Sequence, residues 1–263
     1  MTILVGGVGR LNQGDFDLGR LAVERLRRES HGPRVVVEEL SYGAVAVAQR
    51  LQELCPDQLI LVGAVRRGRA PGEVTRRRVG GLGAPTEPTR HAVAEAATGY
   101  VSIDLVLEVG SALGALPFRT VVVEVEPATA GPSEPSEAMS IAAEGGLEVA
   151  LDLVRAELRR APLMELSDVL RELASNVRAR VASEHLTPSP AYGAFRDLLN
   201  ELAVVEHEGR WGRTFAFRDR LRGHILAAEM GPEIDQLDHM EWSLIWALIE
   251  ELDRLERLEG SRP

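Results

Sequence analysis

The chain has 263 residues, of which 45% are hydrophobic, enough for one large or two modest domains with a sizeable core. Its net charge of −10 argues against nucleic acid as a partner, and its single cysteine excludes an internal disulfide and a four-cysteine metal site. The opening MTILVGGVG is too short and glycine-rich for a signal peptide, and no apolar run approaches the ~18 residues that span a membrane. We therefore expect a soluble, cytoplasmic protein.

The first half of the chain alternates strand-like and helix-like segments. Strands are predicted at residues 3–9, 34–40, 58–65 and 119–127, and helices at residues 18–28, 45–54, 103–113 and 140–160. This alternation predicts an α/β fold, with a mostly parallel sheet covered by helices on both faces. Residues 70–90 are rich in Gly, Pro and Arg, so we expect a loop there, or a loop with an irregular edge strand.

The second half of the chain is predicted to be mainly helical. Helices are expected at residues 163–184, 189–203, 218–230 and 233–258, with a β-hairpin at 204–217 that turns near Gly209. We place the domain boundary near Pro162, which divides the chain into an α/β domain (1–162) and a helical domain (163–263). Helices with a hairpin also suit a winged-helix DNA-binding module, but this half is acidic and its arginines are interleaved with acids.

The last predicted helix carries two tryptophans, Trp242 and Trp246, which are four residues apart and so lie on one side. Packing in the core is the preferred interpretation of its apolar residues. The alternative is an interaction face, because tryptophans often anchor protein interfaces. The four histidines of this half form no metal-binding pattern, and we interpret them as structural or exposed; they are His185, His207, His224 and His239.

A glycine-rich loop, GGVGRLNQGDFDLG, follows the first strand and opens the first helix. A dinucleotide-binding loop needs G-x-G-x-x-G, so that the backbone can approach a pyrophosphate. Gly7 and Gly9 fit this pattern, but Asn12 stands where the third glycine belongs, and Asp15 and Asp17 would repel phosphate. Nucleotide binding is therefore not expected.

Several further motifs occur in the order and spacing of one known family. The chain has Gly7-Val8-Gly9 with Asp15 and Gly19, then Gly43, the strand Asp57–Leu61, RRGRAPGEV (Arg66–Val74), SIDLVLEVGSALGALP (Ser102–Pro117) and VVVEVEP (Val121–Pro127). These motifs are collinear over residues 3–127, and the helix after them fits as well. Up to about Arg160 the chain resembles the [NiFe]-hydrogenase maturation peptidase family.

The resemblance implies a function and a set of site residues. The family removes a C-terminal extension from the hydrogenase large-subunit precursor after nickel loading. Its metal is contacted by an acidic residue of the first loop, an Asp at the end of the third strand and a His at the start of the following helix. In this chain these positions map to Phe16, Gly63 and Gly99, none of which can bind a metal through its side chain. We therefore expect no catalytic site, no bound metal and no cofactor.

Four residues could replace the lost ligands: Asp15, Asp17, His91 and Asp104. The preferred interpretation of the first two is that of helix-start acids, and of His91 that of a surface histidine. The leading hypothesis is a non-catalytic relative that binds a [NiFe]-hydrogenase large-subunit precursor or an assembly factor. One alternative is an active maturation endopeptidase with a displaced metal site, and another is a protein-binding module without any link to hydrogenase. Neither membrane nor nucleic acid is expected as a partner.

Overall fold

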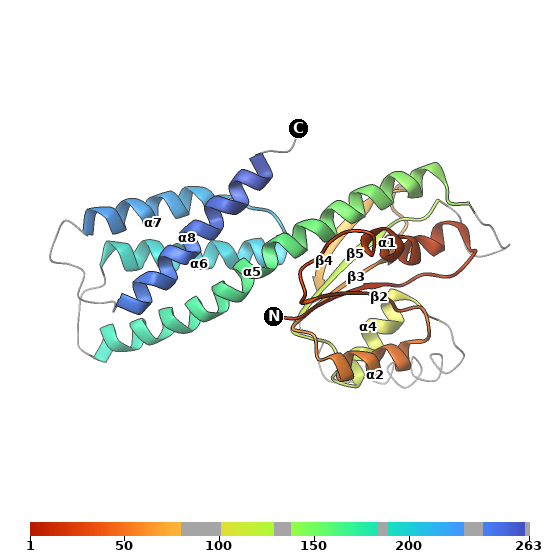
Figure 1. The fold of residues 1–263 in the computed structure, drawn as a ribbon, viewed down its shortest axis with the longest axis horizontal. Helices are drawn as coiled ribbons and strands as arrows, with labels where there is room; N and C mark the ends of the chain where they lie inside the picture. The colour runs from red at the N-terminus through yellow and green to blue at the C-terminus, as the bar shows by residue number, and fades with distance from the viewer. Residues whose placement is uncertain (80–100, 129–137, 184–188, 229–238, 261–263) are drawn as a thin grey trace. The chain divides into compact units, whose positions relative to one another are not determined.

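The computed structural model describes residues 1–79, 101–128, 138–183, 189–228 and 239–260 (Figure 1). The chain forms two compact units, Met1–Leu158 and Arg159–Pro263. In the part of the chain that is described, no helix is both long enough and apolar enough to cross a membrane.

The first unit is built on a five-stranded sheet. Its strands are β1 (Ile3–Gly7), β2 (Val35–Glu39), β3 (Gln58–Ala64), β4 (Val74–Val79) and β5 (Arg119–Val125). They lie in the order β2-β1-β3-β5-β4, and all neighbours are parallel except the edge strand β4, which runs antiparallel to β5. Because β1, β3 and β5 are interior strands, their residues are buried almost without exception. The segment expected as a loop with an edge strand contains β4, and its residues 80–90 lie outside the described part.

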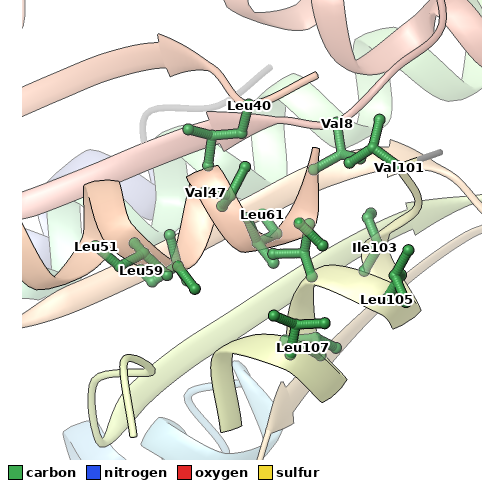
Figure 2. Close-up of a cluster of buried hydrophobic side chains, with 14 of the residues drawn as sticks. Val8, Leu40, Val47, Leu51, Leu59, Leu61, Val101, Ile103, Leu105 and Leu107 are labelled. Atoms are coloured by element: carbon green, nitrogen blue, oxygen red, sulfur yellow. The ribbon is translucent and has the colours of Figure 1, made fainter. Parts of the chain in front are cut away.

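Helices cover both faces of this sheet. Helices α2 (Ala44–Leu54) and α4 (Ile103–Ala112) pack on one face, and their apolar side chains form a core with those of β1, β3 and β5 (Figure 2). The other face is covered by α1 (Leu18–Leu26) and by the first part of α5 (Ile141–Ser183) (Figure 1). A salt bridge between Arg25 of α1 and Glu148 of α5 joins these two helices. The predicted α/β class with a mostly parallel sheet is confirmed.

The glycine-rich loop allows α1 to pack very closely against the end of β1. A Cβ atom on Gly7 would lie 2.1 Å from the carbonyl oxygen of Gly19, and one on Gly19 would lie 2.2 Å from that of Val8. Only glycine fits at such a backbone approach. The two glycines therefore serve the contact between strand and helix, and the loop between them contains a short 3-10 helix, η1 (Gly14–Asp17).

Helix α5 is continuous from Ile141 to Ser183, so the prediction of two separate helices at 140–160 and 163–184 is wrong. A proline inside a helix removes one hydrogen bond and costs about 3 kcal/mol. Its neighbours Ala161 and Leu163 are buried, and burial of such side chains offsets this cost. The division between the two compact units falls inside this helix, just before Pro162. That the two parts fold independently stays a prediction.

The second unit is a helical bundle, formed by the end of α5 with α6 (Pro190–Glu208), α7 (Thr214–Ala228) and α8 (His239–Gly260). The predicted hairpin at 204–217 is wrong, because α6 continues to Glu208 and α7 begins at Thr214. The apolar spacing of α6 extends to Val205, which is buried, and Gly209 ends the helix in a left-handed conformation at φ 73°. Trp242 and Trp246 pack against the core of the bundle and are only partly buried.

Candidate functional site

The carboxyl ends of parallel strands meet at one edge of a sheet, where α/β proteins usually bind ligands. Two of the three positions that match the family's metal-contacting residues lie at this edge. Gly63 is near the end of β3, and Phe16 belongs to the loop after β1. Gly99 and His91 lie outside the described residues, so this edge is considered without them.

The space beside Gly63 is occupied by other parts of the protein. A Cβ atom at this position would lie 2.4 Å from the carbonyl oxygen of Val8 and 3.2 Å from Cδ1 of Ile103. Val8 and Ile103 are both part of the core shown in Figure 2. The main chain of Val8 is held in place, because its N–H donates a 2.9 Å hydrogen bond to the carbonyl of Val62. No side chain fits at position 63 without a shift of this backbone.

Phe16 helps to close the loop after β1. Its carbonyl oxygen accepts a 2.8 Å hydrogen bond from the N–H of Arg10, and the guanidinium of Arg10 lies 5.7 Å from the centre of its ring. This is the geometry of a cation–π contact. The aromatic ring therefore packs with an arginine at the position where the sequence resemblance predicted the family's acidic ligand.

Asp15 is buried and holds two distant segments of the chain. Its carboxylate accepts hydrogen bonds from the N–H groups of Ala128 and Ser140, both at 2.7 Å, and from the hydroxyl of Ser140 at 3.0 Å. The loop after β1 is thereby joined to the segment after β5 and to the start of α5. Charge-assisted bonds of this kind are strong, and releasing this carboxylate for a metal would remove the acceptor of all three bonds.

Asp17 is also engaged within the protein. Arg20 donates to both of its carboxylate oxygens, from Nε at 2.8 Å and from Nη2 at 2.6 Å. In the described part of the chain, no group of three or more His, Cys, Asp or Glu residues is placed to hold a metal ion. Phe16 and Gly63 offer no side-chain ligand to a divalent metal, and the carboxylates of Asp15 and Asp17 are bound by other groups of the protein.

A different charged group lies beside Gly63. Glu124 of β5 is the register partner of Gly63 on β3, so the two residues face the same side of the sheet. Its side chain is fully buried, and it accepts hydrogen bonds from Arg67 at 2.8 and 3.1 Å and from Arg77 at 2.9 Å. Arg69 is a third guanidinium, at 3.5 Å.

This arginine–carboxylate cluster extends to the start of α4. Arg67 also binds both oxygens of Asp104, at 2.6 and 3.0 Å. Asp104 therefore pairs with an arginine, and sequence reasoning considered it only as a replacement metal ligand. The sequence feature that could have predicted this cluster is Glu124, because a lone carboxylate inside the apolar strand VVVEV needs a cationic partner. The segment RRGRAPGEVTRRR contains several arginines that could be this partner.

The cluster shifts the titration of its members. Burial alone would raise the pKa of Glu124, but the hydrogen bonds and charges of Arg67 and Arg77 outweigh burial and lower that pKa. The pKa of Arg67 is raised, first by its hydrogen bond to Glu124 and then by that to Asp104. Glu124 and Arg67 are therefore both charged at neutral pH.

The chain is similar in fold to solved hydrogenase maturation peptidases. It is 26% identical to the maturating endopeptidase HybD from E. coli, over 61% of this chain and 94% of that one, with a TM-score of 0.44. It is 21% identical to the hydrogenase 2 maturation peptidase of a Thaumarchaeota archaeon, over 59% and 95% of the two chains, with a TM-score of 0.41. For the maturation protease HycI from Thermococcus kodakarensis, the identity is 20%, the shares are 60% and 92%, and the TM-score is 0.38.

The resemblance predicted from the sequence is thus confirmed as one of fold, over about 60% of this chain. No protein-family model and no curated protein sequence matches the chain.

Proposed function

We propose that this protein is a non-catalytic homologue of the [NiFe]-hydrogenase maturation peptidases, and that it assists hydrogenase assembly by binding a large-subunit precursor or an assembly factor. The collinear motifs over residues 3–127 support the link to this family. The occupied space beside Gly63 is the single observation that carries the non-catalytic part of the proposal.

Amide hydrolysis requires an enzyme to lower a large barrier, and the resemblance implies a metal for that task. At position 63 a metal-binding side chain would collide with the main chain of Val8. Asp15 and Asp17 are the acids on either side of Phe16 in the sequence, and both already have hydrogen-bond partners inside the protein. Rebuilding the metal site would require these contacts to break.

A cysteine nucleophile is not suitably placed either. Cys55 is exposed at the end of α2, just before β3 begins, which puts it at the amino end of the parallel strands. The candidate site lies at the opposite, carboxyl edge of the sheet. The thiol of Cys55 donates to the carbonyl oxygen of Gln52 at 2.8 Å, which is a local contact within α2.

The test is to incubate the protein with nickel-loaded large-subunit precursor, with an active maturation peptidase as positive control. We expect the two proteins to co-elute in size-exclusion chromatography while the precursor keeps its full length. Specific cleavage that is lost in Asp17→Asn would contradict the proposal and favour an endopeptidase with a displaced site. If neither binding nor cleavage occurs, the chain is instead a protein-binding module with another client.

The exposed parts of Trp242 and Trp246 are the proposed contact of the helical unit with this partner. In the same assay, Trp246→Leu should weaken binding without changing the helical content. Phe215→Leu is the matched control, because Phe215 also packs partly buried against the core of the bundle. If Trp246→Leu and Phe215→Leu weaken binding equally, the tryptophan contributes through packing alone.

A further inference from the structure

We infer that Arg67 and Arg77 form a carboxylate-binding site at the carboxyl edge of the sheet, in which Asp104 is an internal ligand that an external carboxylate replaces. This inference does not depend on the proposed function. It rests on how the two arginines are held, on what they bind at present, and on which side of the cluster faces solvent.

The inner side of the site is rigid. Glu124 is fully buried on an interior strand and accepts hydrogen bonds from both Arg67 and Arg77. The carboxylate of Glu126 accepts from the main-chain N–H groups of Arg67 and Gly68, at 2.8 and 3.0 Å. The side chain of Arg67 is therefore anchored to Glu124 of β5, and its backbone to Glu126 just after this strand. A guanidinium held in this way loses little freedom when it binds a further ligand.

The outer side of the site is occupied by Asp104. Arg67 binds its two oxygens in a bidentate arrangement, at 2.6 and 3.0 Å, and Nη2 of Arg77 is 3.8 Å from the nearer oxygen. The side chain of Asp104 is 53% exposed, whereas Glu124 is not exposed at all. The cluster therefore has one carboxylate that water can reach and one that it cannot.

This contrast makes Asp104 the replaceable ligand. Exposed ion pairs contribute little to stability, so the bond between Asp104 and Arg67 is a weak competitor for an incoming anion. Without Asp104, the guanidinium groups of Arg67, Arg69 and Arg77 would share one carboxylate, the fully buried Glu124, as far as the described residues show. The planar fork of arginine matches a carboxylate, and the start of α4 adds a favourable helix dipole for a negative charge.

The test uses the full-length chain, labelled with nitrogen-15, and follows the Nε–Hε signals of its arginines by NMR. Sodium succinate is titrated at constant ionic strength, with the uncharged succinamide as control. We expect saturable shifts at Arg67 and Arg77, and affinity up to about fivefold higher in Asp104→Asn, because the internal competitor has been removed. Arg77→Gln should weaken binding, and its amide spectrum shows whether the fold is retained.

Asp152→Asn is the matched control for Asp104→Asn, because Asp152 is also an exposed carboxylate that pairs with an arginine of the first unit. It should leave the succinate titration unchanged. If no arginine signal saturates in either the natural chain or Asp104→Asn, there is no carboxylate site. Equal affinity in these two proteins would show that Asp104 is not the replaceable ligand. Either result overturns the inference.

The source of the carboxylate is distinguished by tri-alanine with a free C-terminus and its C-terminal amide. Tighter binding of the free acid than of succinate, with no binding of the amide, would support the inference and identify a peptide C-terminus as the ligand. Binding of succinate but not of the tripeptide acid would support it and identify a small carboxylic acid.

Discussion

Substitution of Gly63 is the most direct test of the occupied space beside this residue. In Gly63→Ala the new methyl group would lie 2.4 Å from the carbonyl oxygen of Val8, far inside van der Waals contact. The neighbour is backbone just after β1, held by a hydrogen bond to the carbonyl of Val62, so it cannot rotate away as a flexible side chain would. Overpacking of this kind typically costs about 1–3 kcal/mol, and we expect about 2 kcal/mol for Gly63→Ala. Gly63→Asp should cost more, because it also places a charge against Ile103.

The chain offers a convenient assay for this effect. Its three tryptophans all lie in the second unit, so their fluorescence reports on that unit, whereas far-UV circular dichroism reports on both. With a urea dependence of about 1–3 kcal/mol per molar, a loss of 2 kcal/mol lowers the midpoint by about 1 M. We expect the urea midpoint of the first unit's transition, seen in circular dichroism but not in fluorescence, to fall by this amount. The fluorescence midpoint should stay unchanged. A shared shift would show that the two units unfold together.

Two results would refute this reasoning. The first is a free energy of unfolding for Gly63→Ala within about 0.5 kcal/mol of the natural chain, which is the range of ordinary surface substitutions. The second is stoichiometric nickel binding by the double variant Phe16→Glu, Gly63→Asp, measured by calorimetry. Either would mean that position 63 has room for a side chain.

The remaining predictions concern packing, an internal anchor and pH. Gly145→Ala should stabilise the protein by about 0.5–1 kcal/mol, because no atom lies within 4 Å of the new methyl group on α5. The neighbouring substitution Gly146→Ala should destabilise the protein by about 1–3 kcal/mol, because the methyl group would lie 2.6 Å from the side chain of Val125 and 2.8 Å from the carbonyl oxygen of Gly72. Melting temperatures that shift in the same direction for both variants would contradict this packing. Asp15→Ala should cost about 1–3 kcal/mol, since it removes the buried acceptor of the N–H groups of Ala128 and Ser140. Hydrogen exchange should rise at those two amides, and unchanged exchange would show that the carboxylate is not their acceptor. Because the folded-state pKa of Glu124 is lowered, its pairing with Arg67 stabilises the protein above the ordinary carboxyl value of 4.5, and this contribution is lost as the pH falls through the folded-state pKa. In acid titrations Glu124→Gln should therefore lose less stability below pH 4.5 than the natural chain does, and an identical pH profile would contradict the lowered pKa.

Local sequence pattern was sufficient for the first unit's architecture. Apolar runs such as QLILVGA, bounded by turn residues, predicted interior strands, and alternation with helices predicted the parallel sheet. The pattern was insufficient where tertiary packing overrides a local signal. Pro162 was interpreted as the end of a helix and residues 204–217 as a hairpin, but buried apolar neighbours keep α5 helical through Pro162 and extend α6 to Glu208.

The candidate site divides in the same way. The resemblance read from the sequence predicted that Phe16 and Gly63 stand where the family has metal ligands. Only the tertiary structure placed the carbonyl of Val8 in the space beside Gly63, and only it joined Arg67 to Glu124, 57 residues further along the chain. A parallel sheet brings together the ends of strands that are far apart in sequence, and such contacts leave no periodic pattern to read. For this reason the sequence could predict which side chains stand at the family's ligand positions, and only the fold decided what surrounds them.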